Sequence, residues 1–192
     1  MDSRESSRGR LIVISAPSGA GKTSIARAIL ARHPSMRFSV SATTRARRLG
    51  ELEGRDYYFL SRKEFEQRVA AGAFAEWEEI YGDLYGTLRS EIDRALEAGE
   101  SLLFDVDVKG GLSIKALYPE AVLIFIRPPS VEKLYERLRN RRTEDVATLT
   151  RRMERVPMEL SLGERFDHGV VNDVLERAIE EVDGIVQKAI DH

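Results

Sequence analysis

A glycine-rich turn near the N-terminus constrains the fold of this chain more than any other feature of its sequence. The turn follows a short apolar run at residues 11–14 and precedes a helical pattern over residues 22–32. A strand, a glycine turn and a helix in this order form a P-loop, in which backbone N–H groups and the helix N-terminus bind phosphate groups. The sequence therefore predicts a phosphate site at Ala16, Pro17, Ser18, Gly19, Ala20, Gly21, Lys22 and Thr23.

The residue types in this turn favour the phosphates of ATP. Lys22 is expected to contact the β- and γ-phosphates, and the Thr23 hydroxyl to coordinate Mg²⁺, the expected cofactor. Gly19 and Gly21 allow backbone conformations that a side chain would resist. The strict motif begins with glycine, whereas this chain has the small residue Ala16 there. We therefore expect Lys22 to be catalytic in a phosphoryl transfer from ATP.

Strand-sized apolar runs alternate with helical patterns along the rest of the chain. The runs occupy residues 101–107, 121–127 and 169–172, and helical spacing covers residues 131–142 and 175–190. Continuous apolar strands separated by helices predict a parallel sheet with helices on both faces. The 192-residue chain is therefore expected to be a single α/β domain of the P-loop NTPase class, with three α/β/α layers.

The segment between the first helix and the second core strand has a different pattern. Ser61 and Glu64 form a capping box, and Gly72 ends the helix that this box begins. Residues 56–60 and 74–81, on either side of that helix, are expected to be strands. The segment therefore predicts a small antiparallel insertion beside the main sheet.

The composition excludes several classes of protein. The chain has no cysteine, which rules out disulfides and thiolate metal sites, and its net charge of −2 gives no general attraction to nucleic acid. Its longest apolar runs are too short to cross a bilayer. Residues 1–9 are polar and lack the apolar stretch of a signal peptide, so we expect a disordered tail and a cytoplasmic location. No nucleic-acid or membrane partner is expected, and the oligomeric state, including a homodimer, is left open.

Two carboxylates, Asp105 and Asp107, end the second apolar run. Residues i and i+2 share one face of a strand, so both side chains can point at a ligand at the carboxyl edge of the sheet. Mg²⁺ keeps several waters and needs few carboxylates, so this pair is suited to it. The alternative is that one of them only caps the following turn.

Local structural roles are also expected for two residues of the middle segment. Thr87 is expected to cap a helix, and Trp77 is expected to lie in the core.

A dense set of arginines lies in the last third of the chain, with seven of them between Arg137 and Arg155. The usual interpretation of such a set is a solvated helical face. Beside a phosphate site, the alternative is a lid whose guanidinium groups close on the phosphates.

A second anion site is predicted after the first helix, where two arginines precede a tyrosine. Two guanidinium groups and a phenol can hold one phosphate through hydrogen bonds. At this point the chain resembles the guanylate kinase family, because the signature T-T-R-x-x-R-x-x-E-x-x-G-x-x-Y-x-F matches residues 43–59 without a gap. The resemblance extends over residues 10–190. The residues that carry the predicted anion site are Arg45, Arg48, Glu51, Gly54 and Tyr57.

The resemblance implies transfer of the γ-phosphoryl group of ATP to GMP, and also to dGMP. Glu76 is implied to bind guanine, whose N1–H and N2 amine are two donors that one carboxylate can accept together, whereas adenine has no such pair. Arg45 is implied to be catalytic, and Asp107 to hold the metal through water together with Thr23. The implied GMP contacts are Ser41, Arg45, Arg48, Tyr57, Glu76, Tyr85, Thr87 and Asp105.

The same resemblance implies a lid and a division of the chain. The core comprises residues 10–40, 91–129 and 161–192, the GMP-binding insertion residues 41–90, and the helical lid residues 130–160. Catalytic arginines on the lid are expected over the ATP phosphates, and one asparagine near the adenine side of ATP. These residues are Arg137, Arg141 and Arg152, with Asn172.

Three residues depart from the family pattern, namely Lys109, Arg142 and Pro157, and Pro157 is expected to kink or break a lid helix. Two other functions are compatible with the same scaffold. A ribose bisphosphate kinase on the same scaffold would not need a set of residues that recognises guanine. A non-catalytic guanylate-kinase-like binding module would typically have a degenerate P-loop, whereas Lys22 and Thr23 are intact here.

Overall fold

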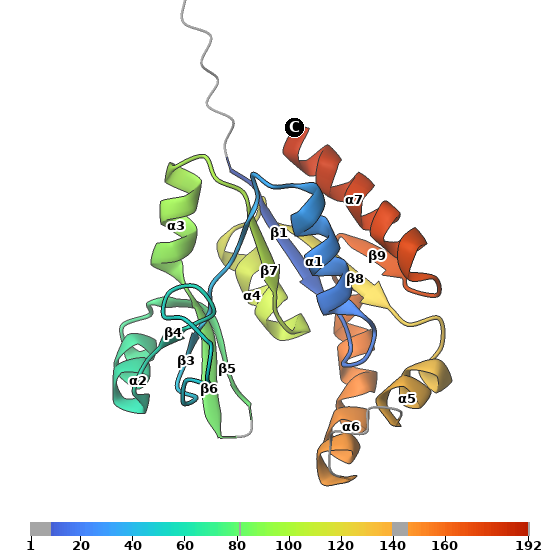
Figure 1. Ribbon diagram of the computed structural model, residues 1–192, viewed down its shortest axis with the longest axis horizontal. Helices are drawn as coiled ribbons and strands as arrows, with labels where there is room; N and C mark the ends of the chain where they lie inside the picture. Colours follow the sequence, from blue (N-terminus) through green and yellow to red (C-terminus); the bar gives the residue numbers. More distant parts are fainter. Residues whose placement is uncertain (1–8, 81, 140–145, 192) are drawn as a thin grey trace, which may run out of the picture.

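A five-stranded parallel sheet forms the centre of the protein (Figure 1). The structure, a computed structural model, describes residues 9–80, 82–139 and 146–191, with the side chains of the last range described from residue 149. The strands are hydrogen-bonded in the order β2-β7-β1-β8-β9, and the central strand β1 is buried along its whole length. Their bounds are β1 Leu11–Ser15, β2 Arg37–Phe38, β7 Leu102–Asp105, β8 Val122–Arg127 and β9 His168–Val171.

Helices cover both faces of this sheet. Alternate side chains of β1 enter different apolar clusters: Ile12 and Ile14 pack with residues of α1 and α7, and Val13 packs with residues of α3 and α4. The predicted three-layer α/β/α fold class is therefore confirmed. The helices packed around this sheet are α1 Lys22–Arg32, α3 Arg89–Glu97, α4 Val108–Leu117, α5 Val131–Arg139, α6 Val146–Gly163 and α7 Leu175–Asp191.

A second sheet of four strands lies beside the first (Figure 1). Strand β6 is antiparallel to both β3 and β5, whereas β3 and β4 are parallel, so the sheet is mixed where an antiparallel one was expected. Phe65 of helix α2 is fully buried and stacks on Phe74 of β5, which gives this part of the chain an apolar cluster of its own. The elements are β3 Ala42–Thr43, β4 Tyr58–Phe59, α2 Arg62–Ala70, β5 Phe74–Ile80 and β6 Asp83–Leu88.

Local signals in the insertion are confirmed at one helix and wrong at the next. The Ser61 hydroxyl accepts a hydrogen bond from the Glu64 backbone N–H, and the Glu64 carboxylate accepts one from the Ser61 N–H, which completes the predicted capping box of α2. Gly72 follows that helix with a φ of 66°. Thr87, by contrast, lies within β6 and does not cap α3, whose N-cap residue is Leu88.

The second core strand is shorter than its apolar run suggested. Strand β7 ends at Asp105, and Asp107 is the N-cap of α4, where its carboxylate accepts a hydrogen bond from the Gly110 N–H at 2.7 Å. The two carboxylates therefore do not share one face of a strand. The capping alternative is correct for Asp107, and its second oxygen accepts a hydrogen bond from Arg155 at 3.2 Å.

Two expectations about single residues are changed by the structure. Pro157 was expected to kink or break a lid helix, but helix α6 runs from Val146 to Gly163 without a break, and its fully buried residue Val156 packs in the core. Trp77 is 49% exposed and does not lie in the core.

The expectations for the N-terminal tail, for Arg141 and for Arg142 concern residues that lie wholly or mostly outside the described ranges. Residues 1–8 of the expected tail lie outside them, as do Arg141 and Arg142, while Gly9 is buried against the backbone of Glu100. Within the ranges described, none of the helices combines the length and apolar character needed to span a membrane.

Candidate active site

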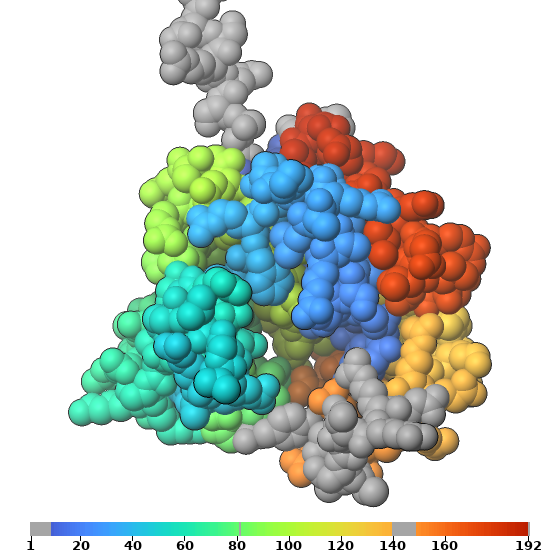
Figure 2. All heavy atoms as spheres, viewed as in Figure 1, coloured from blue at the N-terminus to red at the C-terminus, as the bar shows by residue number. Residues whose placement is uncertain are grey.

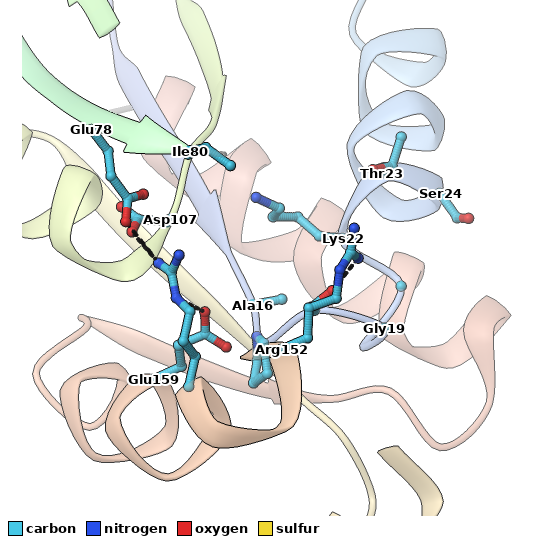
Figure 3. A pocket seen from close by; sticks show the side chains of 14 residues that line it. Ala16, Gly19, Lys22, Thr23, Ser24, Glu78, Ile80, Asp107, Arg152 and Glu159 are labelled. Carbon is cyan, nitrogen blue, oxygen red and sulfur yellow. Dashed lines mark hydrogen bonds and ion pairs between the residues drawn. The ribbon is translucent and has the colours of Figure 1, made fainter. Parts of the chain in front are cut away.

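A cavity of about 300 Å³ opens at the carboxyl edge of the central sheet. Four parts of the chain form its walls: the P-loop with the start of α1, strand β5 of the insertion, Asp107 at the start of α4, and helix α6. A hollow between the insertion and the core is visible on the molecular surface (Figure 2). Lys22 and Thr23 lie across this cavity from Glu78 and Asp107 (Figure 3).

The P-loop adopts the backbone conformation that its glycines permit. Gly19 and Gly21 have φ values of 90° and 97°, a region that side chains disfavour. A Cβ atom on Gly21 would also lie 2.3 Å from Nδ2 of Asn172. Asn172 is 4% exposed, and its side-chain amide donates a hydrogen bond to the Ala20 carbonyl at 2.7 Å. Asn172 therefore supports the loop from behind, and its expected contact near adenine stays a prediction.

Lys22 and Asp105 form an ion pair at the end of the loop. The Lys22 Nζ lies 2.5 Å from Asp105 Oδ1 and donates to the Val106 carbonyl at 3.0 Å. The Thr23 hydroxyl donates to the other Asp105 oxygen at 3.5 Å. Asp105 thus links strand β7 to the first turn of α1. Lys22, expected to contact phosphate, and Thr23, expected to bind the metal, both contact this one carboxylate.

Glu76 and Thr87 come together because β5 and β6 are paired. They lie opposite each other in the strand register, and the Thr87 hydroxyl donates to Glu76 Oε1 at 2.6 Å. Burial raises the pKa of Glu76 above its ordinary value, and the hydrogen bond from Thr87 opposes this in part. A largely buried carboxylate with one orienting partner is a suitable acceptor for two parallel N–H donors.

The predicted anion site is assembled around Arg45. Its guanidinium donates to Glu51 Oε1 at 2.6 Å and lies 5.3 Å from the centre of the Tyr57 ring, which contacts Tyr85 edge-on at 6.1 Å. The Arg48 backbone N–H donates to the second Glu51 oxygen at 2.8 Å, while the Arg48 residue is exposed. Glu51 of the signature therefore holds the arginine segment in place. Ser41 immediately precedes β3, and its carbonyl accepts a hydrogen bond from the backbone N–H of Tyr58, the neighbour of Tyr57, at 2.9 Å.

One of the three predicted lid arginines, Arg152, lines the cavity, and a second, Arg137, contacts Asn172 behind the P-loop. Arg152 of α6 donates to the Ser18 hydroxyl at 2.7 Å, and Arg137 of α5 donates to the Asn172 carbonyl at 3.2 Å. Arg141 lies outside the described residues. Arg152 therefore contacts the P-loop directly, whereas Arg137 contacts the residue that supports it.

Residues 8–189 match the family model described as Guanylate kinase. The chain is 50% identical to the guanylate kinase of Chlorobium luteolum over 91% of this chain and 89% of that protein, and 49% identical to that of Chlorobaculum tepidum over 91% and 90%. Its fold is similar to the crystal structure of guanylate kinase from Anaplasma phagocytophilum, with a TM-score of 0.73, 32% identity and coverage of 95% and 86%. The chain belongs to the guanylate kinase family.

Membership of the guanylate kinase family confirms the resemblance inferred from residues 43–59 and the enzyme class that it implied. Neither alternative function is favoured by these matches. The match also covers the P-loop that begins with Ala16, a residue that is 7% exposed and fits the loop without a glycine at that position.

Three charged residues of the cavity were missed by the sequence analysis: Glu78, Arg155 and Glu159. Burial and the neighbouring Asp107 raise the pKa of Glu78 to about 7. Two spacings could have indicated them. Glu78 is two residues from Glu76 on one strand, and Arg155 and Glu159 follow Arg152 at helical spacing, so each shares a face with a predicted site residue.

Proposed function

We propose that this protein transfers the γ-phosphoryl group of ATP to GMP, giving ADP and GDP. The observation that carries the proposal is the pairing of two sites across one cleft. The P-loop and Lys22 line one side, and the guanine-suited pair of Glu76 and Thr87 lies on β5 and β6 of the insertion. The family to which the chain belongs supports the same reaction.

On the donor side, the P-loop amides of residues 16–23 and Lys22 bind the ATP phosphates. Lys22 then exchanges part of its contact with Asp105 for phosphate oxygens. Arg137, Arg141 and Arg152 supply positive charge where it is needed as the phosphoryl group moves. The attacking phosphate of GMP is already anionic, so no proton has to be removed from it. The protein has to position the two substrates and neutralise the charge on the transferred phosphoryl group.

On the acceptor side, Glu76 accepts hydrogen bonds from N1–H and the N2 amine of guanine, and Thr87 orients the carboxylate. The GMP phosphate takes the place of Glu51 as a partner of Arg45, close to Tyr57. None of the proposed contacts is to the ribose 2′-hydroxyl, so dGMP is an acceptor as well. The full proposed set is Ser41, Arg45, Arg48, Tyr57, Glu76, Tyr85, Thr87 and Asp105.

The donor atoms at the P-loop suit Mg²⁺. The Thr23 hydroxyl lies 3.5 Å from Asp105 Oδ2, and Asp107 adds a carboxylate on the same side of the sheet, so the site offers hard oxygen donors. We propose that Thr23 holds the ion directly and Asp107 through water. When bound with ATP, Mg²⁺ neutralises charge on the β- and γ-phosphate oxygens.

The division into parts follows the proposed reaction. Residues 41–90 present GMP, residues 130–160 form the lid over ATP, and residues 10–40, 91–129 and 161–192 form the core. Closure of these two parts over the substrates excludes water, which competes as phosphoryl acceptor. Because ATP and GMP are the substrates and the chain has no cysteine, we propose that it acts in the cytoplasm.

A coupled assay of ADP release tests the proposal. The purified protein is given ATP with GMP, dGMP, AMP or ribose 1,5-bisphosphate, each with and without Mg²⁺. We expect turnover with GMP and dGMP that requires Mg²⁺, and none above background with AMP. An absence of turnover with GMP would contradict the proposal, and turnover with ribose bisphosphate alone would support the other kinase. A Lys22→Ala variant that kept full function would support a non-catalytic binding module.

A further inference from the structure

Arg155 joins three parts of the chain in one set of contacts. Its Nη2 lies 2.9 Å from Glu78 Oε1 on strand β5 and 3.2 Å from Asp107 Oδ2 at the start of α4, while its Nε lies 3.6 Å from Glu159 Oε1 on its own helix. The carboxylates of Glu78 and Asp107 lie close together on the wall opposite Lys22 (Figure 3). We refer to Arg155 with Glu78 and Asp107 as the Arg155 bridge.

Arg155 compensates the negative charges of the carboxylates that it contacts. Glu78 and Asp107 both lie within 3.2 Å of Arg155 Nη2, so one guanidinium compensates two carboxylates that would otherwise repel each other. Glu159, which is 7% exposed, has one oxygen without a hydrogen-bond partner among the described residues and relies on the same guanidinium for its charge. Removing one cation from such a group leaves carboxylates uncompensated, which costs more than the loss of one contact.

The position of the bridge connects it to the acceptor site. Glu78 lies two residues after Glu76 on β5, so the two side chains project from the same face about 7 Å apart along the strand. A contact that holds Glu78 against α6 therefore also holds Glu76 and its partner Thr87 in place relative to the P-loop. The other end of the bridge is Asp107, whose first oxygen is occupied by the Gly110 N–H and whose second is turned toward Arg155.

We propose that Arg155 is a positioning residue for the acceptor nucleotide. By compensating the negative charges of Glu78 and Asp107, it keeps the insertion strand β5 close to helix α6 and the start of α4, and so sets the distance between the guanine site and the P-loop. It does this without contacting either substrate. The inference rests on the proposed function, since it assigns Arg155 to the binding of GMP rather than of ATP.

Steady-state kinetics of three variants test the bridge. Arg155→Met is expected to lower kcat/KM for GMP about tenfold, mainly through KM for GMP, with KM for ATP changed less than about threefold. Glu78→Gln alone keeps an amide beside Arg155 and is expected to change either constant less than about threefold. Because Glu78→Gln removes the repulsion that Arg155→Met exposes, the double variant is expected to return to within about threefold of the unmodified protein.

A matched ion pair on α3 serves as the control. Arg94 and Glu91 lie 2.7 Å apart, away from the cavity, and are truncated in the same way as Arg94→Met and Glu91→Gln. These variants are expected to leave both KM values unchanged. Multiplicative losses in the Glu78→Gln/Arg155→Met variant, or an equal rise of KM for ATP and for GMP in Arg155→Met, would overturn the proposal, because a general effect on α6 predicts both.

A distance measurement decides the same question without catalysis. The chain has no cysteine, so Lys63→Cys on α2 and Glu154→Cys on α6, both exposed, allow two spin labels to be attached at defined positions. Arg155→Met is expected to lengthen the distance between the labels, and added Glu78→Gln to shorten it again. Equal distances in the labelled protein, in its Arg155→Met variant and in its Glu78→Gln/Arg155→Met variant would overturn the proposal. If the protein did not phosphorylate GMP, the kinetic results would fail for every variant while this distance would still report the bridge.

Discussion

The two halves of the cleft are built in different ways. The donor half consists mainly of backbone: eight consecutive residues form the P-loop, supported by Asn172 and by the large core around β1. The acceptor half consists of side chains that come from separate strands and loops of the insertion, which rests on a much smaller apolar cluster around Phe65. A phosphate can be bound by repeated N–H groups of one turn, whereas a base requires particular side chains at particular places. The donor half should therefore tolerate changes at a distance better than the acceptor half.

The largest expected effect is at Lys22. Lys22→Ala is expected to lower kcat by roughly 10²–10³-fold, because one positioned cation is lost where charge develops during transfer. KM for GMP should change little, since Glu76 and Thr87 are untouched. Steady-state kinetics with both substrates varied measure the two effects. A parallel loss of GMP affinity would mean that the two halves are less separate than the geometry indicates.

At the acceptor half, Glu76→Gln is expected to lower kcat/KM for GMP about 100-fold, because one of the two guanine donors then faces an amide N–H₂. The value of kcat/KM for ATP at saturating GMP should stay close to that of the unmodified protein. Glu79→Gln, an exposed position on the same strand, is the matched control. Equal losses at both positions would argue against a specific role of Glu76.

Thr87→Val is expected to have a smaller effect on the same site. The substitution keeps the shape of the side chain but removes the donor that orients Glu76 at 2.6 Å, and a hydrogen bond to a charged group contributes about 1.5–3 kcal/mol. We expect KM for GMP to rise by about tenfold or more, with kcat little changed. A large fall in kcat with an unchanged KM would instead place Thr87 in the transfer step.

The smallest expected effect lies behind the donor half, where α1 meets α7. Burial raises the pKa of Asp183, but hydrogen bonds from His33 and Arg32 outweigh it, so the net pKa lies below the ordinary value of 3.8. A depressed pKa means that this contribution to stability is complete above pH 3.8 and is lost as the pH falls through the lower pKa of the folded state.

Asp183→Asn is therefore expected to lower the free energy of unfolding at pH 7 by no more than about 1 kcal/mol. The difference from the unmodified protein should shrink as the pH falls below 3.8. Urea unfolding at a series of pH values measures it. A difference that grew in acid would show that Asp183 stabilises the fold in some other way.

Much of the fold could be predicted because its signals are local. The P-loop, helix α1 at Lys22–Arg32 and the capping box of α2 each depend on residues within a few positions of one another, and each is found where it was expected. The strand β6 was not predicted, and the run at residues 101–107 was assigned too long a strand. Periodicity alone does not show where a strand ends when the next residue is a polar helix cap.

The candidate site could be predicted only in part. Glu76 and Thr87 were both named, but not their contact, which depends on the pairing of β5 with β6. Pro157 was expected to kink or break its helix, but α6 continues through it because burial of flanking residues such as Val156 outweighs the lost hydrogen bond.

The sequence by itself determined the phosphate loop, the parallel α/β core and, through the spacing of residues 43–59, the family to which the chain belongs. Only the tertiary structure decided how the two halves are joined. The Arg155 bridge brings together residues 78, 107 and 155, which no local pattern connects. Local propensities act over a few residues, whereas compensation of buried charge depends on which segments the packed core places side by side.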